Sequence, residues 1–246
     1  MKRVILGLIS FFSYLWFFSW GEGLWGYSES FLLAENYPFK PGEKIVYRLN
    51  YKGVKIGRAE LTFHGEEKFK NKEVFLVTFS TQSLYFKDLE RIFADKENFL
   101  PLRVERKIRG LTIFPTTIEE NYDQENFKVR IRKKTLFFSK NFVIDRDSPI
   151  NNAVLLSYYY RKKKEFKPGE EFLITLPTKS FKLIFKGREK ISTPLGEFWA
   201  YLLEADSSCF KLWFKDDEER VPLKMEVPEF MGYSLVIESI EKEQGK

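Results

Sequence analysis

The sequence predicts an all-β, mainly antiparallel protein in which two duplicated β-meanders form a curled sheet, a barrel or half-barrel, with one helix at about residues 148–162. Three observations lead to this fold class. Segments with period-two alternation recur along the chain, the word FKPGE occurs twice, and one stretch changes to helical spacing. The chain shows no rhythm of alternating strands and long helices, which argues against a parallel α/β fold.

The N-terminus has the pattern of a secretory signal peptide. Lys2 and Arg3 precede an uncharged apolar run, Val4–Trp20, and small residues follow it. We therefore predict residues 1–28 to be a signal peptide and the mature protein to be periplasmic. The alternative is a retained inner-membrane anchor, because the run is just long enough to span a bilayer. The single cysteine, Cys209, cannot form an internal disulfide, which favours a bacterial periplasm over a eukaryotic secretory route.

The repeated word marks the start of two similar units. In Phe39–Glu43 and Phe166–Glu170, the Pro-Gly pair suits a type II turn, and a strand pattern follows each copy. Two further pairs of similar segments follow in the same order: Phe63–Lys68 with Phe185–Lys190, and Phe93–Glu105 with Phe214–Glu226. We predict a duplication within one β-rich domain, residues 38–241, with repeat units at 38–110 and 165–241.

Residues 111–164, between the units, predict a hairpin and then the helix. The hairpin is expected to turn at Asp123–Asn126. Ser148 can cap a helix, Pro149 suits its first position, and Arg161–Lys164 suit its C-terminus.

Three stretches resemble the exported bacterial family called domain of unknown function 3108. They are PFKPGEKIVYRLNYKGVKIGRAEL at Pro38–Leu61, a Tyr-rich helix ending in Arg at Ser148–Arg161 before the Lys167–Gly169 turn, and the Trp213–Pro222 segment, whose spacing is slightly looser than in the family. The resemblance covers roughly Phe39 to Ile240. It implies export, its motifs are structural rather than catalytic, and it brings no established activity with it.

The composition narrows the function classes. A net charge of +6 on 246 residues is too modest, without a matching motif, for a nucleic-acid-binding protein. The sequence contains no paired cysteines for zinc, no P-loop and no dinucleotide fingerprint, so we expect no cofactor and no metal. The abundance of Lys and Glu leans towards a heat-adapted organism.

Candidate catalytic residues have plainer interpretations. His64, the only histidine, aligns with Lys186 in the second unit, which indicates an exposed position, and Cys209 has no motif that would activate it. Asp95 and Glu97 align with Asp216 and Glu218; paired carboxylates can hydrolyse glycosides, but repetition at equivalent positions favours turns. We therefore expect no catalytic residues.

Aromatic residues on the predicted strands suggest a binding groove. Aromatic residues make up 17% of the chain, more than a routine core requires. A curled sheet could leave an apolar groove for an acyl chain or a similar ligand, lined by Tyr47, Phe75, Trp199 and Trp213. The alternative is that these residues form the packed core.

One strand carries a basic face. Lys128, Arg130, Arg132 and Lys134 alternate with apolar residues. This face could contact an anionic membrane or wall surface. The alternative is a solvated outer face or a protected edge strand.

The sequence thus predicts an exported, non-enzymatic protein that binds or carries an apolar or amphipathic envelope ligand, such as a lipid. The alternative is a structural or assembly partner in the cell envelope. A carboxylate-dependent envelope hydrolase is the least favoured hypothesis.

We expect the mature chain to begin between Gly21 and Glu29, where small residues follow the apolar run. N-terminal sequencing of the natural protein checks this. A chain that begins at Met1 or Lys2 would instead indicate a retained membrane anchor.

Overall fold

The computed structural model describes residues 37–110, 113–163, 165–207, 210–227 and 232–242. Within these residues the chain forms fourteen strands and one helix. The elements are β1 (Glu43–Tyr51), β2 (Val54–Phe69), β3 (Lys72–Ser83), β4 (Phe86–Ala94), β5 (Pro101–Gly110), β6 (Ile113–Asp123), β7 (Lys128–Lys134), β8 (Ser139–Asp145), α2 (Leu156–Arg161), β9 (Glu171–Thr175), β10 (Ser180–Thr193), β11 (Gly196–Ala205), β12 (Lys211–Lys215), β13 (Pro222–Val227) and β14 (Tyr233–Glu241).

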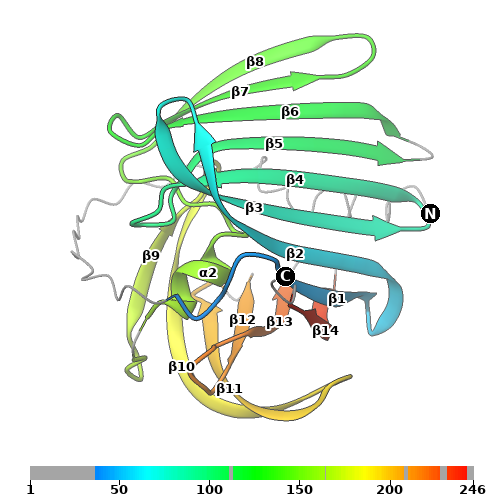
Figure 1. Cartoon of the computed structure of the whole chain (residues 1–246), viewed down its shortest axis with the longest axis vertical. Helices are drawn as coiled ribbons and strands as arrows, with labels where there is room; N and C mark the ends of the chain where they lie inside the picture. The colour runs from blue at the N-terminus through cyan, green and yellow to red at the C-terminus, as the bar shows by residue number, and fades with distance from the viewer. Residues whose placement is uncertain (1–36, 111–112, 164, 208–209, 228–231, 243–246) are drawn as a thin grey trace.

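All fourteen strands form one antiparallel sheet in the order β8-β7-β6-β5-β4-β3-β2-β1-β14-β13-β12-β11-β10-β9. Two meanders, β1–β8 and β9–β14, are therefore joined side by side where β1 pairs with β14. The sheet curls around α2 but does not close, because β8 and β9 remain as its two edges (Figure 1). The predicted all-β curled sheet is confirmed, in its open form.

The two FKPGE segments form the same turn. The amide of the turn glycine donates to a strand phenylalanine in both units: Gly42 N lies 2.8 Å from Phe63 O, and Gly169 N lies 3.0 Å from Phe185 O. The two glycines have φ angles of 83° and 78°, the left-handed conformation that the third position of a type II turn requires. Each turn then leads into the first strand of a meander with the same strand order, β1–β6 and β9–β14.

The predicted hairpin is confirmed, and a further strand follows it. β6 pairs with β7 around Asp123, whose carboxylate Oδ1 accepts the Asn126 amide at 3.1 Å. β8, which we did not predict, pairs with β7 and makes the edge of the sheet. It is a mostly exposed strand, so its apolar alternation is weak.

The helix is shorter than predicted, because its expected start at Ser148 is wrong. α2 begins at Leu156, and the side chain of Asn152 accepts the amides of Val154 at 2.8 Å and Leu155 at 3.3 Å. The Ser148 hydroxyl instead lies 2.6 Å from the hydroxyl of Thr175 on β9. A tertiary contact has therefore replaced the local capping interaction.

Residues 150–153, here called the strap, cross the inner face of the sheet before α2. Gln124 accepts the Ile150 amide at 2.9 Å and donates to the Ile150 carbonyl at 2.9 Å. Asn151 donates its amide to Thr175 O at 2.6 Å and accepts the Thr175 amide at 3.0 Å. The strap is thus fastened to the first meander on one side and to the second on the other.

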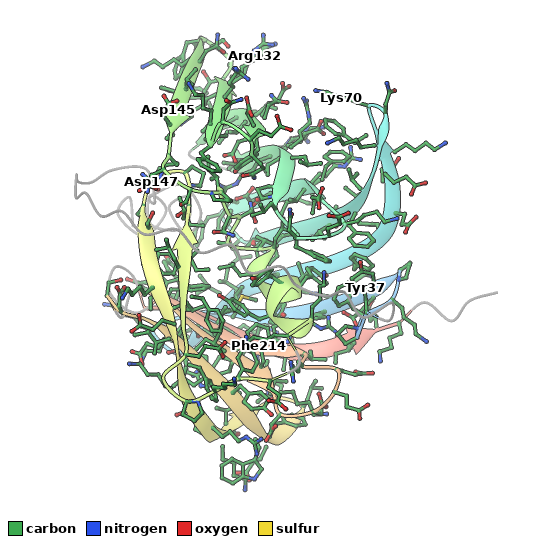
Figure 2. All side chains as sticks on the ribbon, turned by 90° about the vertical axis from the view of Figure 1, so that its left-hand side faces the viewer. Tyr37, Lys70, Arg132, Asp145, Asp147 and Phe214 are labelled. Carbon is green, nitrogen blue, oxygen red and sulfur yellow. The ribbon has the colours of Figure 1, made fainter. Side chains whose placement is uncertain are left out.

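α2 fills the curve of the sheet with aromatic side chains from both meanders around it. Tyr158 packs against Phe39 and Phe63 of the first unit, with ring centroids 4.9 and 5.5 Å apart. Tyr160 packs against Phe172 and Phe214 of the second, at 5.1 and 6.1 Å. Figure 2 shows Phe214 in the interior. One continuous core therefore joins the two units through the helix.

Arg161, at the end of α2, ties this arrangement together electrostatically. Its guanidinium forms a bidentate pair with Glu43, and both side chains are buried. It also donates to the carbonyls of Pro38 and Glu219, each at 2.9 Å. Lys163 makes the matching contact with Glu170, the Glu of the second FKPGE, at 2.7 Å, but there both groups are partly exposed.

The two glutamates of the repeated word should differ sharply in their effect on stability. We expect Glu43→Gln to lower the free energy of unfolding by about 3–5 kcal/mol, because it leaves the Arg161 guanidinium buried and unpaired. Glu170→Gln, the matched control in the other unit, should cost about 1 kcal/mol or less. Chemical denaturation measures both. Equal costs for the two variants would contradict this assignment.

Candidate functional site

The four aromatic residues predicted to line a groove do not come together. Tyr47, Phe75 and Trp213 lie in the packed core, each less than 5% exposed. Trp199, on β11, is 59% exposed on the surface. The structure therefore places three of them in the alternative position, the core, and the fourth in solvent.

The basic face has the predicted alternation. Val129 and Ile131 are buried, and Arg130, Arg132 and Lys134 are exposed. Because β8 lies beyond it, β7 is not an edge strand. Lys128 pairs with Asp145 of β8 at 3.0 Å, and Figure 2 shows Arg132 and Asp145 towards the top of the view, far from Phe214.

The other candidate residues have structural roles or lie outside the described chain. His64 Nε2 lies 2.9 Å from the Thr78 hydroxyl at the surface. Asp95 Oδ1 accepts the Glu97 amide at 2.9 Å, which makes Asp95 a turn residue. The signal peptide and Cys209 fall outside the described residues. Those residues include no group of three or more His, Cys, Asp or Glu side chains that could hold a metal ion, and no helix long and apolar enough to cross a membrane.

A polar cleft that the sequence reasoning missed lies between the inner face of β4–β6 and the strap. Its volume is about 50 Å³, room for about three or four water molecules. It is lined by Glu90, Val104, Arg106, Glu120, Tyr122, Asn151, Asn152, Ala153 and Leu176–Thr178. The first five residues come from the first meander and the last three from the β9–β10 turn of the second, so the cleft exists only where the two units meet.

Strand register brings the charged residues of the cleft to one face. Glu90 on β4 is the direct cross-strand partner of Arg106 on β5, and Val104 is the partner of Glu120 on β6. Glu90 and Arg106 are 5% and 6% exposed. Arg106 also forms a bidentate pair with buried Asp88, with Nε 2.9 Å from each carboxylate oxygen.

Three carboxylates, those of Asp88, Glu90 and Glu120, thus surround one guanidinium. Burial raises the pKa of Glu90 to about 7, although Arg106 and a 3.0 Å hydrogen bond from Asn152 oppose the shift. Burial also raises the pKa of Glu120, which accepts the Tyr122 hydroxyl at 2.5 Å. The cleft is therefore an acidic site whose carboxyl groups are largely shielded from bulk water.

One hydroxyl in the cleft is unused. Thr178 Oγ1 is buried and has no hydrogen-bond partner among the described residues. A buried polar group without a partner costs free energy, so a bound group that supplied a donor here would be favoured. Together with the carboxylates of Glu90 and Glu120, the Thr178 hydroxyl gives the cleft three acceptor groups.

Sequence signals for this site do exist. On β4, Phe86, Asp88, Glu90 and Ile92 share one face with period two, so two carboxylates occupy positions that the pattern assigns to the core. Charged residues at such positions are uncommon unless they are paired or functional.

Comparison with known proteins gives a family. A family model described as a protein of unknown function, DUF3108, matches residues 46–238, well over half of the chain. The chain belongs to this family. The resemblance found in the sequence is thereby confirmed, and the family carries no described activity.

Other comparisons add little. No curated protein matches. A crystal structure from Bacteroides fragilis, described as a "putative exported protein with YmcC-like fold", is 9% identical, with 84% of this chain and 98% of that chain covered and a TM-score of 0.34. Such a score carries no argument about this chain.

The pKa of Glu90 makes stability depend on pH. Unfolded Glu90 titrates near 4.5 and the folded residue near 7, so the folded state loses stability as the pH rises between these values. We expect Glu90→Gln, which keeps the acceptor for Asn152 but carries no charge, to unfold like the wild type at pH 5. At pH 8 it should be more stable by about 3 kcal/mol.

Chemical denaturation across this pH range provides the measurement, with Glu67→Gln as the control because Glu67 is exposed on β2. A constant difference between Glu90→Gln and the wild type at every pH would show that Glu90 titrates normally.

Proposed function

We propose that the protein is an exported, non-enzymatic binding protein of the cell envelope, in which the cleft holds the protonated amino group of an amphipathic ligand. The observation that carries this proposal is the excess of two carboxylates, buried Glu90 and half-buried Glu120, beside the paired Asp88 and Arg106 at a cavity where the two meanders meet. Export is supported by the basic and apolar N-terminal pattern, Lys2 to Trp20.

The chemistry of the cleft suits an ammonium group. An ammonium ion has three donors and no acceptor, and the cleft offers acceptors on Glu90, Glu120 and Thr178. Burial removes the solvation by water that stabilises the ionised carboxylate of Glu90. A bound cation replaces that stabilisation, so it favours the ionised form of this carboxyl, whose pKa is about 7. The small volume fits the head of a ligand and excludes a whole acyl chain.

The apolar part of the ligand would leave the cleft along the neighbouring strands. Glu120 is the cross-strand partner of Ile131, which in turn is the partner of Phe142 on β8. Ile131 belongs to a second hydrophobic cluster with Ile108, Ile118, Val129 and Ile150, and Phe142 and Ile144 pack partly buried against it. The buried members of this cluster are not accessible, but the partly exposed Phe142 and Ile144 beside it offer apolar surface near the cleft, which favours an amphipathic ligand over a wholly polar one.

The open edges of the sheet favour a second function, that of an assembly partner in the envelope. Among the described strands, β8 and β9 each pair on one side only. Apart from Thr175, which Asn151 binds, their outer backbone groups could therefore pair with a strand of another protein. Leu173 on β9 and Val143 on β8 are more than half exposed beside these edges. Co-isolation of a polypeptide, lost when a proline is placed in β9, would support this function.

Ligand binding can be tested on protein isolated from its own envelope fraction. In native mass spectrometry we expect the wild type to carry a small adduct that contains a basic nitrogen. The adduct should be absent from the Glu90→Gln/Glu120→Gln double variant and should be lost as the pH falls below about 7, where Glu90 takes up a proton.

The matched control is Glu67→Gln/Glu97→Gln, which removes the same charge from exposed positions and should keep the adduct. Protein that carries no small molecule, or a double variant that retains it, would overturn the proposed function.

A further inference from the structure

One end of the sheet carries an exposed apolar surface that the cleft does not involve. Because successive strands of a meander run in opposite directions, the β1–β2, β3–β4, β5–β6 and β7–β8 turns lie at the same end, on the right of Figure 1. Three of these turns, adjacent in the sheet, expose six large hydrophobic side chains, here called the apolar tip: Leu84, Tyr85, Phe114, Leu136, Phe137 and Phe138. Val54 of the fourth turn is exposed as well.

The most exposed residues of the apolar tip lie in described turns. Leu84, Leu136 and Phe137 are 84%, 72% and 71% exposed. The Thr135 amide donates to Phe138 O at 2.9 Å, which closes the β7–β8 turn. Phe114 and Phe137, from neighbouring hairpins, meet edge to face with ring centroids 5.1 Å apart. A contiguous exposed apolar surface of this kind marks a site of interaction.

Cations surround the apolar tip. Residues 83–88, 107–110, 113–116 and 132–141 form these hairpin ends, and they contain seven exposed cations: Lys87, Lys107, Arg109, Arg132, Lys133, Lys134 and Lys140. Asp88, the single carboxylate in these segments, is buried against Arg106. None of the seven cations forms a salt bridge with a described carboxylate, in contrast to Lys128 farther along β7.

We propose that this end of the sheet docks on the surface of an anionic phospholipid bilayer. The apolar tip would enter the boundary between headgroups and acyl chains, and the surrounding lysines and arginines would bind lipid phosphates. Charge complementarity selects this partner. A second copy of the chain, placed tip to tip, would bring two sets of seven cations together, which like-charge repulsion opposes.

This surface differs from the basic face predicted on β7. Arg132 and Lys134 belong to both, but Lys128 and Arg130 lie farther from the turn. The sequence reasoning did not consider the hydrophobic residues of the apolar tip. In the proposed docking, these residues are the part of the surface that enters the bilayer. The inference does not depend on the proposed ligand, since no residue of the apolar tip lines the cleft.

Vesicle flotation of the full chain tests the proposal. We expect the wild type to float with vesicles that contain about a third phosphatidylglycerol, and less well with neutral phosphatidylcholine vesicles or at high salt. Leu136→Ser/Phe137→Ser should reduce partitioning about tenfold, and Lys133→Gln/Lys134→Gln should reduce it mainly at low salt. Both pairs are exposed, and thermal unfolding should confirm that the variants fold.

The control is Leu195→Ser, an exposed leucine in the β10–β11 turn, which should float like the wild type. All variants share one N-terminus, so differences between them report on the apolar tip. A second measurement compares Phe137→Trp with Leu195→Trp in the presence of lipids with brominated chains. These lipids should quench the fluorescence that the added tryptophan contributes in Phe137→Trp but not in Leu195→Trp. Equal flotation of the wild type and the Leu136→Ser/Phe137→Ser variant, or equal quenching at both positions, would overturn the proposal, as would a tip-dependent dimer without flotation.

Discussion

The buried ion pair between Arg161 and Glu43 is the constraint on which the arrangement of the two meanders depends. A guanidinium in a protein interior is tolerated only when its donors are satisfied. Here the partners come from the start of the first meander, through Glu43 and Pro38, and from the end of a turn in the second, through Glu219. The helix that carries Arg161 is therefore fixed between the two units, and the curl of the sheet is fixed with it. The strap leads directly into this helix, so the position of Asn152 beside Glu90 follows from the same interaction.

The two units use one frame and then differ. Phe99 and Arg220 occupy equivalent positions, both with left-handed backbone conformations, and cover Phe39 and Phe166 at 5.8 and 5.3 Å. The duplication itself stays a prediction, but these paired contacts explain why one helix can serve both units. The cleft lies where the units are unlike. β4 has nine residues and carries two inward carboxylates. Its counterpart β12 has only five residues, and the three at its centre, Leu212, Trp213 and Phe214, are all buried and carry no charge. The candidate site is therefore formed by residues in which the two units differ, and not by the turns and packing contacts that they share.

Local patterns were sufficient to predict much of the fold, because turns and alternation depend on nearby residues. The FKPGE turns, the Asp123–Asn126 hairpin and the all-β class belong to this group. The start of α2 could not be predicted in this way. Ser148 has a local capping signal, but its hydroxyl bonds to Thr175, which is distant in sequence. The candidate site could not be predicted from the sequence for the same reason. Alternation can show that Glu90 points inwards, but not that Asn152, sixty-two residues away, lies against it. Nor could aromatic content alone separate Trp199, which is exposed, from Tyr47, which is buried.

The positions of the cleft and the apolar tip bear on how the two would work together. Glu120 and Phe114 lie on the same strand, β6, six residues apart, which corresponds to about 20 Å along the strand. A bilayer's headgroup region is only about 5–8 Å deep on each side. If the end of the sheet docks on a bilayer with its strands upright, the cleft therefore stands in water above the headgroups. An amphipathic molecule must leave the membrane at least in part to place its amino group beside Glu90 and Glu120.

The carboxylates of the cleft can select an amino group in water, because its positive charge is then its most distinctive feature. An apolar groove at the same height would bind only a molecule whose whole acyl chain had left the bilayer. The small, electronegative cleft is thus the kind of site that a docked protein could use to recognise headgroups.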